Sequence, residues 1–378
     1  MSPSDQELLS QLRWWLTLPP TNLIDRGDHI RFRHALYLIV HQTSAAILTL
    51  HDRPQTLTFP STLQDVTIGL DGLLNPVACG QRLLEMIGLA DDRKAWSTAA
   101  GLIRAVLDLA DSSGHEFIKP IEHIPKSPDL LHTLAVEVAD RYRTMDGIEA
   151  IALSGSLGRG LADKGSDVDL SVFCRAVPRQ NDRSTLIKHI VQSCAVKIEP
   201  ACDTFWMDGS LIHIRYWISD EVTQVLMGPD TPPGNPFLAE DLQCCTPIVD
   251  DNNHLAEQQL TVRYFSPALI EAIIGASHGR LSHFRMLWND AQGRDDRLHL
   301  YCLANQAVND WLIALFALNH RYLSTPKWIA TQLGAFPLVP ERCLTRVTEI
   351  MGPLTSNDDP RWEILEGLWG DLLRLRDQ

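Results

Sequence analysis

Two aspartates, Asp167 and Asp169, stand at the start of an apolar run that ends at Phe173. Alternate side chains of a β-strand point to the same face, so this spacing predicts that both carboxylates lie on one side of a strand. Two carboxylates placed so close together are unfavourable unless a cation lies between them. Mg²⁺ prefers oxygen ligands and often shares them with substrate phosphates, so it is the cation that the arrangement predicts.

A glycine-serine pair precedes the aspartates. Gly155 and Ser156 follow the apolar run 151–153, and ten residues separate Ser156 from Asp167. Glycine lets the backbone approach a ligand closely, and successive amides at the start of a helix bind anions. The serine hydroxyl can donate to a terminal phosphate. The two features together predict a metal–nucleotide site.

The stretch 149–173 resembles the signature of the polymerase-beta-like nucleotidyltransferase superfamily, in which Gly-Ser is followed at this distance by Asp-x-Asp between apolar runs. It is most similar to the branch that includes the aminoglycoside adenylyltransferases. The resemblance implies transfer of a nucleotidyl group, AMP from ATP or another nucleoside triphosphate, to a hydroxyl of a small molecule. It assigns Asp167 and Asp169 to Mg²⁺, and Gly155 and Ser156 to the triphosphate.

Three further residues have a predicted role at the nucleotide. Arg159 is expected to reach a β- or γ-phosphate or to cap the turn. Ser166 directly precedes Asp167, as is usual in this branch, and is expected to orient its carboxylate. Lys327 lies in a segment that resembles part of the helical domain following the catalytic domain in the family. It is expected to lie near the phosphates or to solvate a helix end.

The superfamily carries a third carboxylate on a strand that leaves a hairpin. Here that strand is predicted over 210–217, and the corresponding position holds His213. A neutral imidazole can accept a proton from an acceptor hydroxyl, but it supplies no negative charge for a second Mg²⁺. Either another carboxylate completes the site, or one metal works with His213 as base, or catalysis has been lost. The alternative carboxylates are Asp203, Asp208 and Glu199.

Two classes of function therefore stay open. In the first, the protein is a Mg²⁺-dependent nucleotidyltransferase acting on a small molecule. In the second, a catalytically impaired domain binds a nucleotide or a partner protein; an ion pair between Arg215 and Asp169 that fills the metal site would favour this class. Transfer of the nucleotidyl group to a protein side chain is a third hypothesis.

Charge narrows the range of partners. The 378 residues include 47 acidic and 33 basic side chains, which gives a net charge of −14. A general nucleic-acid binder needs a basic surface, so the balance argues against nucleic acid as a partner. It is compatible with a cationic small molecule as acceptor.

The sequence also predicts a cytoplasmic protein that is not membrane-bound. None of the eight cysteines forms a CxxC pair, which indicates small buried side chains in a reducing compartment. The N-terminal residues lack the pattern of a signal peptide, and no apolar run is long enough to cross a bilayer.

The expected fold class is α+β, with a small mixed sheet flanked by two all-α helical domains. The nucleotidyltransferase-like core is expected over 119–250, and the helical domains over 1–118 and 251–378. Within the core, strands are expected at 150–154, 168–174, 196–207 and 210–218, helices at 130–145 and 183–194, and a hairpin turn at Asp208-Gly209. From about residue 219 onward the pattern is helical.

The two helical flanks match each other in sequence, which predicts an internal duplication. The alignment sets Arg26-x-Asp28 on Arg294-x-Asp296, Leu50 on Leu318, Cys79 on Cys343 and Trp96 on Trp362. The N-terminal copy has Ser61 where the C-terminal copy has Lys327. It is therefore expected to have a structural or dimerising role, which is compatible with a homodimer.

Overall fold

The computed structural model describes residues 11–12, 16, 28–50, 86, 88–111, 124–191, 196–226, 230–324, 328–353 and 360–378. The chain forms two compact units. Unit 1 contains residues 1–117, 275–315 and 326–378, and unit 2 contains residues 118–274 and 316–325. The division into three domains stays a prediction.

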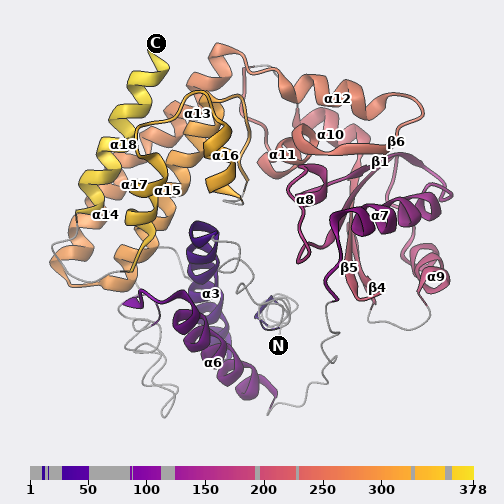
Figure 1. Ribbon diagram of the computed structural model, residues 1–378, viewed down its shortest axis with the longest axis horizontal. Helices are drawn as coiled ribbons and strands as arrows, with labels where there is room; N and C mark the ends of the chain where they lie inside the picture. The colour runs from indigo at the N-terminus through magenta and orange to yellow at the C-terminus, as the bar shows by residue number, and fades with distance from the viewer. Residues whose placement is uncertain are drawn as a thin grey trace. The chain divides into compact units, whose positions relative to one another are not determined.

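Unit 2 is built on a six-stranded mixed sheet with the strand order β3-β4-β5-β2-β1-β6 (Figure 1). β2 and β5 run parallel, and the other neighbouring strands run antiparallel. The strands are β1 Ile148–Leu153, β2 Val168–Cys174, β3 Val196–Glu199, β4 Cys202–Met207, β5 Ser210–Ile218 and β6 Thr246–Val249. This mixed sheet with surrounding helices confirms the α+β class.

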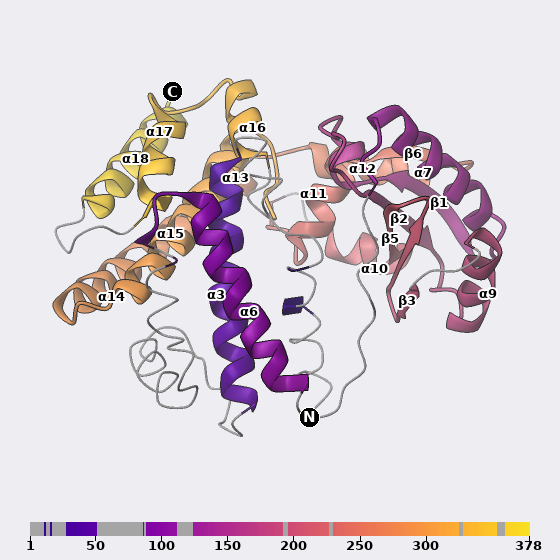
Figure 2. The same ribbon diagram turned by 60° about the horizontal axis from the view of Figure 1, so that its bottom comes forward.

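Helices cover both faces of the sheet (Figures 1 and 2). On one face, α7 Pro128–Tyr142 and α9 Gln180–Ile190 contribute to the apolar core. On the other face, the core includes residues of α10 Ser219–Val225, α11 Pro236–Cys244 and α12 His254–Arg263. The short helix α8 Gly155–Gly158 directly follows β1, and α13 Pro267–Gly279 follows α12. Because both faces are covered, the buried part of β1, residues 150–153, is apolar at every position rather than alternating.

The side chains of β1 divide between the two faces by the period of two. Ile151 and Leu153 enter the core beneath α7, whereas Ala150 and Ala152 face the α11–α12 side. The same period in β2 places Val168 in the α7 core and leaves Asp169 on the opposite face.

Two elements differ from the sequence prediction. The single strand expected at 196–207 is a hairpin of β3 and β4, with its turn at Pro200 and Ala201. Proline has no amide to donate to a ladder, which explains the break. β6 occupies a stretch expected to be helical; it is short, contains Pro247 and lies at the sheet edge, where proline is tolerated.

The hairpin turn at Asp208-Gly209 is confirmed. Met207 pairs with Ser210 across the turn, and the two turn residues have φ values of 52° and 74°. Two positive φ angles are typical of the tight turn that joins twisted antiparallel strands.

Unit 1 is helical in the residues described. Its helices are α3 His29–Leu50, α6 Asp92–Asp111, α14 Leu281–Gly293, α15 Arg297–Leu318, α16 Ile329–Ala335, α17 Cys343–Met351 and α18 Arg361–Arg376. Trp288, Trp311 and Trp362 are almost fully buried. A hydrogen bond of 2.8 Å from the Tyr301 hydroxyl to the Arg33 carbonyl oxygen joins α15 to α3.

Two helices of unit 1 bear on the predicted duplication. α3 and α15 each contain 22 residues. Each follows an aspartate whose side chain accepts a hydrogen bond from an amide in the first turn. Asp28 accepts from Arg31 at 3.3 Å, and Asp296 accepts from His299 at 3.0 Å. Of the other predicted matches, Cys79 falls outside the described residues, so the duplication stays a prediction.

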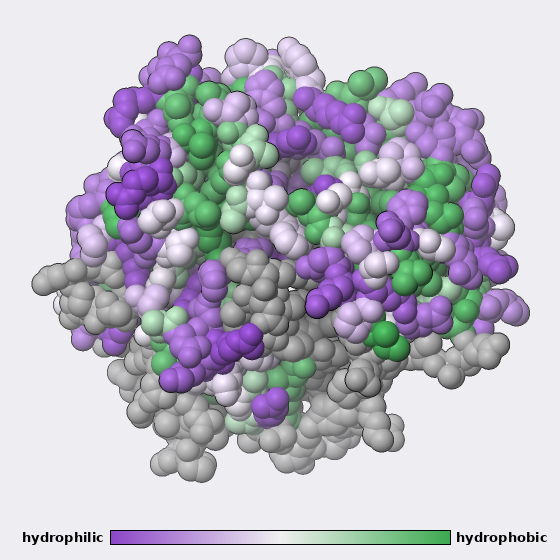
Figure 3. Space-filling view, viewed as in Figure 1, coloured by the Kyte–Doolittle hydropathy of each residue, from purple (hydrophilic) through white to green (hydrophobic). Residues whose placement is uncertain are grey.

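Among the residues that the structure describes, no helix is both long and apolar enough to cross a membrane. On the face shown in Figure 3, hydrophilic and hydrophobic residues are interspersed over the described parts of the chain.

Candidate functional site

The Gly-Ser turn and the second aspartate are neighbours in the structure. The amide of Ser154, at the end of β1, donates to the carbonyl oxygen of Asp169 at 2.9 Å. α8 begins at the next residue, Gly155. Since β1 and β2 pair antiparallel, the turn that leaves β1 lies beside the start of β2. The juxtaposition predicted from the motif is therefore present.

Gly155 is held so close to Asp169 that no side chain fits. Its φ is +57°, and a Cβ atom built on it would lie 1.9 Å from Oδ2 of Asp169. Both facts require glycine here, since L residues rarely adopt this φ and the contact is far below a van der Waals distance.

The hydroxyl of Ser156 is buried and has no hydrogen-bond partner among the described residues. A buried hydroxyl without a partner is unfavourable, and such a group invites a functional explanation. The side chains of Asp167 and Asp169 are partly exposed, so both carboxylates are accessible to a cation. A hydroxyl donor on the turn that packs against Asp169 would suit a nucleotide phosphate carried by Mg²⁺.

His213 stands directly across from Asp169 in the parallel pair of β2 and β5. Its Nδ1 lies 3.4 Å from Oδ1 of Asp169, and its Nε2 lies 2.9 Å from Sγ of Cys202. Burial lowers the pKa of His213, but its hydrogen bonds to Asp169 and Cys202 and their charges outweigh burial and raise it to about 10. A pKa in this range favours the imidazolium at neutral pH, and its charge faces the Asp169 carboxylate.

Asp203 is not near this site, which excludes it as the third carboxylate. It is fully buried on the α7 face, where Arg183 Nη1 lies 2.5 Å from its Oδ1. The hydroxyls of Tyr216 and Tyr142 donate to its Oδ2 at 2.6 and 3.3 Å. Successive residues of β4 face opposite sides, so Cys202 contacts His213 while Asp203 points away from it.

Glu199 is paired elsewhere, and Asp208 lies in the turn between β4 and β5. Glu199 lies on the edge strand β3, three strands from β2 or roughly 14 Å, and pairs with Lys197 at 2.5 Å. Asp208 is exposed in the hairpin turn, where its carbonyl oxygen accepts a 2.6 Å hydrogen bond from Lys126. Among the described residues, no group of three or more His, Cys, Asp or Glu side chains is arranged to hold a metal ion.

Comparison with known proteins identifies a family for one part of unit 2. Residues 135–216, from α7 to β5, match the nucleotidyltransferase domain family. This stretch is a nucleotidyltransferase domain of the polymerase-beta-like superfamily. A solved structure of a nucleotidyltransferase-like protein from Exiguobacterium sibiricum 255-15 is similar at 14% identity with a TM-score of 0.31, over 66% of this chain and 74% of its own. No curated protein matches the chain.

Domains of this family use a nucleoside triphosphate and a divalent metal ion, and their general reaction is nucleotidyl transfer. In this nucleotidyltransferase domain, Asp167, Asp169, Gly155 and Ser156 stay the predicted ligands of such a substrate.

Two predicted nucleotide ligands of the domain are engaged elsewhere. Arg159 does not point freely into the site, because its Nη2 donates to Oε1 of Glu240 at 2.6 Å and both side chains are largely buried. The Ser166 hydroxyl hydrogen-bonds with Asp163, accepting from its amide at 3.0 Å and donating to its carboxylate at 3.2 Å. Ser166 therefore shapes the turn before Asp167 rather than contacting its carboxylate.

Arg215 does not fill the metal site. Its guanidinium lies 4.2 Å from the ring centroid of Phe237, and the salt bridges of the described residues do not include a pair with Asp169. The ion pair that would favour a non-catalytic domain is thus not formed by Arg215. Lys327 falls outside the described residues.

Two acidic residues of α11, Glu240 and Asp241, were missed by sequence reasoning. Both are buried beside the motif. Asp241 accepts hydrogen bonds from the hydroxyls of Ser171 and Ser154, and burial raises the pKa of its carboxyl group. The available signal was an adjacent Glu-Asp pair between apolar residues of a short helix, since such carboxylates are rarely buried without partners.

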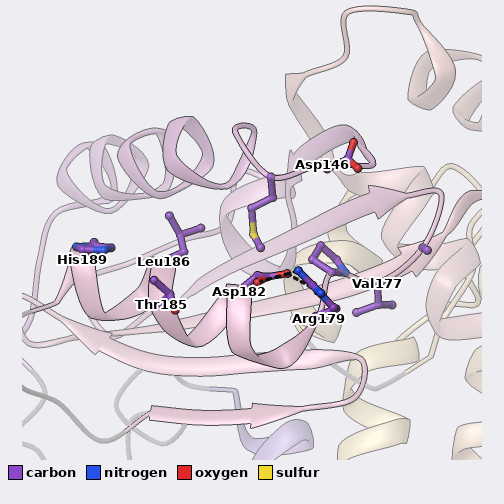
Figure 4. A pocket seen from close by; sticks show the side chains of 10 residues that line it. Asp146, Val177, Arg179, Asp182, Thr185, Leu186 and His189 are labelled. Carbon is purple, nitrogen blue, oxygen red and sulfur yellow. Dashed lines mark hydrogen bonds and ion pairs between the residues drawn. The ribbon is translucent and has the colours of Figure 1, made fainter.

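A cavity of about 650 Å³ lies away from these residues (Figure 4). Its lining includes Asp146 before β1 and Val177, Arg179 and Asp182 after β2. These segments lie at the end of the β1–β2 pair opposite the Gly-Ser turn, so the cavity is separate from the candidate site.

Proposed function

We propose that unit 2 catalyses Mg²⁺-dependent transfer of AMP from ATP to a hydroxyl group of a small molecule. The observation that carries the proposal is the contact of the Gly-Ser turn with the Asp169 strand. Gly155 packs against the Asp169 carboxylate, and the buried Ser156 hydroxyl beside it has no partner among the described residues.

Each residue has a role that its position supports. Asp167 and Asp169 would hold the metal, which neutralises phosphate charge in nucleotidyl transfer. The Ser156 hydroxyl would donate to a phosphate oxygen. Two protein carboxylates suffice for one Mg²⁺, because this ion keeps several waters and takes further ligands from the phosphates.

His213 would accept the proton of the attacking hydroxyl. It lies beside Asp169 on the same face, within reach of a group bound there. A divalent cation next to the ring disfavours the imidazolium, so the neutral imidazole, which can act as a base, is the form expected in the loaded site.

A cationic acceptor such as an aminoglycoside suits the net charge of −14. The resemblance to the small-molecule branch points the same way. The proposal has three further parts. Lys327 would lie near the phosphates, residues 1–118 and 251–378 would form separate helical domains, and the protein would form a homodimer.

A specific observation also favours a second function, nucleotide binding without efficient transfer. Nδ1 of His213 lies 3.4 Å from Oδ1 of Asp169, on the strand where the sequence led us to expect a third carboxylate. That pair competes with a cation for the same carboxylate. A domain built in this way would bind nucleotide or a partner protein without turning over.

Calorimetric titration with ATP and Mg²⁺ tests the proposed site. The wild-type protein is expected to bind ATP only when Mg²⁺ is present, and Asp167→Asn/Asp169→Asn is expected to lose binding. The matched control is Asp208→Asn, which removes an exposed carboxylate from the same sheet and should bind like wild type. Absence of binding in the wild type would refute the proposal.

His213→Asn separates the two functions. If His213 is the base, the variant should bind Mg²⁺–ATP within a few-fold of wild type. Its rate of transfer to an aminoglycoside should fall by about 100-fold or more. Pyrophosphate release measured against a panel of aminoglycosides checks this. No release in the wild type, together with tight binding, would favour the binding function.

A further inference from the structure

Helix α11 places a buried carboxylate directly behind the motif. Asp241 is 5% exposed, and its Oδ2 accepts hydrogen bonds from the hydroxyls of Ser171 and Ser154, the latter at 3.3 Å. The two hydroxyls also contact each other at 2.7 Å. One carboxylate oxygen thus joins a helix to the two central strands of the site.

The two serines hold different halves of the motif. Ser154 is the residue before Gly155, and its amide donates to the Asp169 carbonyl oxygen at 2.9 Å. Ser171 lies two residues after Asp169 in β2, so both side chains point to the same face. A carboxylate that binds both hydroxyls fixes the Gly-Ser turn relative to the strand of Asp169.

We propose that Asp241 is a positioning residue that holds the Gly155-Ser156 turn against the Asp169 strand and thereby sets the affinity of the site for a divalent cation. This inference rests on the proposed function and names a part of the same site that the motif does not contain. Asp241 acts through Ser154 and Ser171, because no hydrogen bond of its own to the metal-binding carboxylates is seen among the described residues.

Asp241 also brings an acidic side chain close to Asp169. Its carboxylate interacts electrostatically with Asp169, so the cation site has a third acidic group close by. In the superfamily pattern that group comes from a strand, where this chain has His213. Here an acidic group comes from a helix and supports the site from behind, as outer residues of metal sites commonly do.

Neighbouring residues of α11 secure the helix itself. Glu240 binds Arg159 at 2.6 Å and accepts the Ser324 amide at 2.8 Å. Gln243 donates to the His320 carbonyl oxygen at 2.8 Å. Gln259 of α12 donates to the carbonyl oxygens of Leu242 and Cys245 at 3.1 and 2.8 Å. α11 is therefore anchored on several sides, and only Asp241 reaches the two serines.

The test compares four proteins: wild type, Asp241→Asn, Ser171→Ala and the control Gln259→Ala. Gln259→Ala loosens the end of α11 without touching the serines. Two quantities are measured on each full-length protein. The first is Mn²⁺ binding followed by electron paramagnetic resonance. The second is amide hydrogen exchange of residues 154–161, which needs no metal.

Asp241→Asn is expected to weaken Mn²⁺ binding by about 10-fold or more. It should also speed exchange at residues 154–161, because hydrogen bonds from the two hydroxyls to a neutral amide oxygen are weaker than those to a carboxylate. Ser171→Ala should cause smaller changes in both quantities, and Gln259→Ala should change neither. Ser171→Ala keeps the question answerable if Asp241→Asn fails to fold.

Wild-type values for both quantities in Asp241→Asn, or equal changes in Asp241→Asn and Gln259→Ala, would overturn the inference. If the wild type binds no Mn²⁺, the proposed function fails, and the exchange rates alone then decide the role of Asp241. Faster exchange of residues 154–161 only in the Asp241→Asn and Ser171→Ala variants would support the positioning role of Asp241. Unchanged exchange in these variants would refute that role.

Discussion

Gly155→Ala is expected to abolish Mg²⁺–ATP binding in a domain that still folds. The new Cβ would lie 1.9 Å from Oδ2 of Asp169, so the carboxylate must leave its position or the turn must move. The positive φ of +57° adds a cost of about 1–2 kcal/mol for a residue with a Cβ. Calorimetric titration measures the binding, and thermal unfolding measures the stability.

Gly160→Ala is the matched control for this prediction. Gly160 has a φ of +67° in the same segment, but a Cβ there would meet nothing within 4 Å. Its variant carries the backbone cost alone and should bind Mg²⁺–ATP like wild type. Equal loss of binding in both variants would show that strain in the turn, rather than the contact with Asp169, decides binding. Normal binding by Gly155→Ala would contradict the role given to this contact.

The parts of the site that lie within one strand or turn could be predicted from the sequence. The period of two predicts that Asp169 faces the opposite side of β2 from Val168, and Asp208-Gly209 marks the turn before β5. Each depends on neighbours in sequence, where backbone geometry leaves few choices.

The parts that depend on distant partners could not be predicted. Arg159 meets Glu240 across 81 residues of chain, and Ser171 meets Asp241 across 70. A sequence shows that an arginine can bind a phosphate or a carboxylate, but not which of the two the fold brings to it. The same limit left Asp203 as a candidate ligand, although its neighbour Cys202 is the residue that reaches His213.

The largest effect on stability is expected at the ion pair of Asp203 with Arg183, which is buried in the α7 core. The two side chains are 0% and 1% exposed. Arg183 also donates to the carbonyl oxygens of Pro178 and Glu199, both at 2.9 Å. Removing one partner of a buried pair leaves an unpaired charge, so Arg183→Met should lower the free energy of unfolding by about 3–5 kcal/mol.

Two further variants show whether the charge is the cause. Arg183→Met/Asp203→Leu should regain most of the loss, since apolar residues can replace a buried pair. Arg179→Met, which breaks an ion pair with Asp182 at a site 85% exposed, should cost less than about 1 kcal/mol. Urea unfolding at neutral pH measures all three; a loss in Arg179→Met as large as in Arg183→Met would contradict the burial argument.

The stability of Arg183→Met should depend on pH, and the direction of that dependence tests the same argument. Burial raises the pKa of Asp203 above its ordinary value of 3.8, and Arg183 opposes this, so loss of the arginine raises the pKa further. A carboxyl group with a raised pKa in the folded state is destabilising above its unfolded pKa and harmless once protonated. The stability deficit of Arg183→Met should therefore shrink as the pH falls from 7 towards 4. The double variant has no carboxylate at position 203 to protonate, so its stability deficit relative to wild type should not shrink in this way as the pH falls.

The double variant should also keep wild-type affinity for Mg²⁺–ATP, because Asp203 lies on the opposite face of the sheet from Asp169. Weakened binding in a folded double variant would reinstate Asp203 at the metal site.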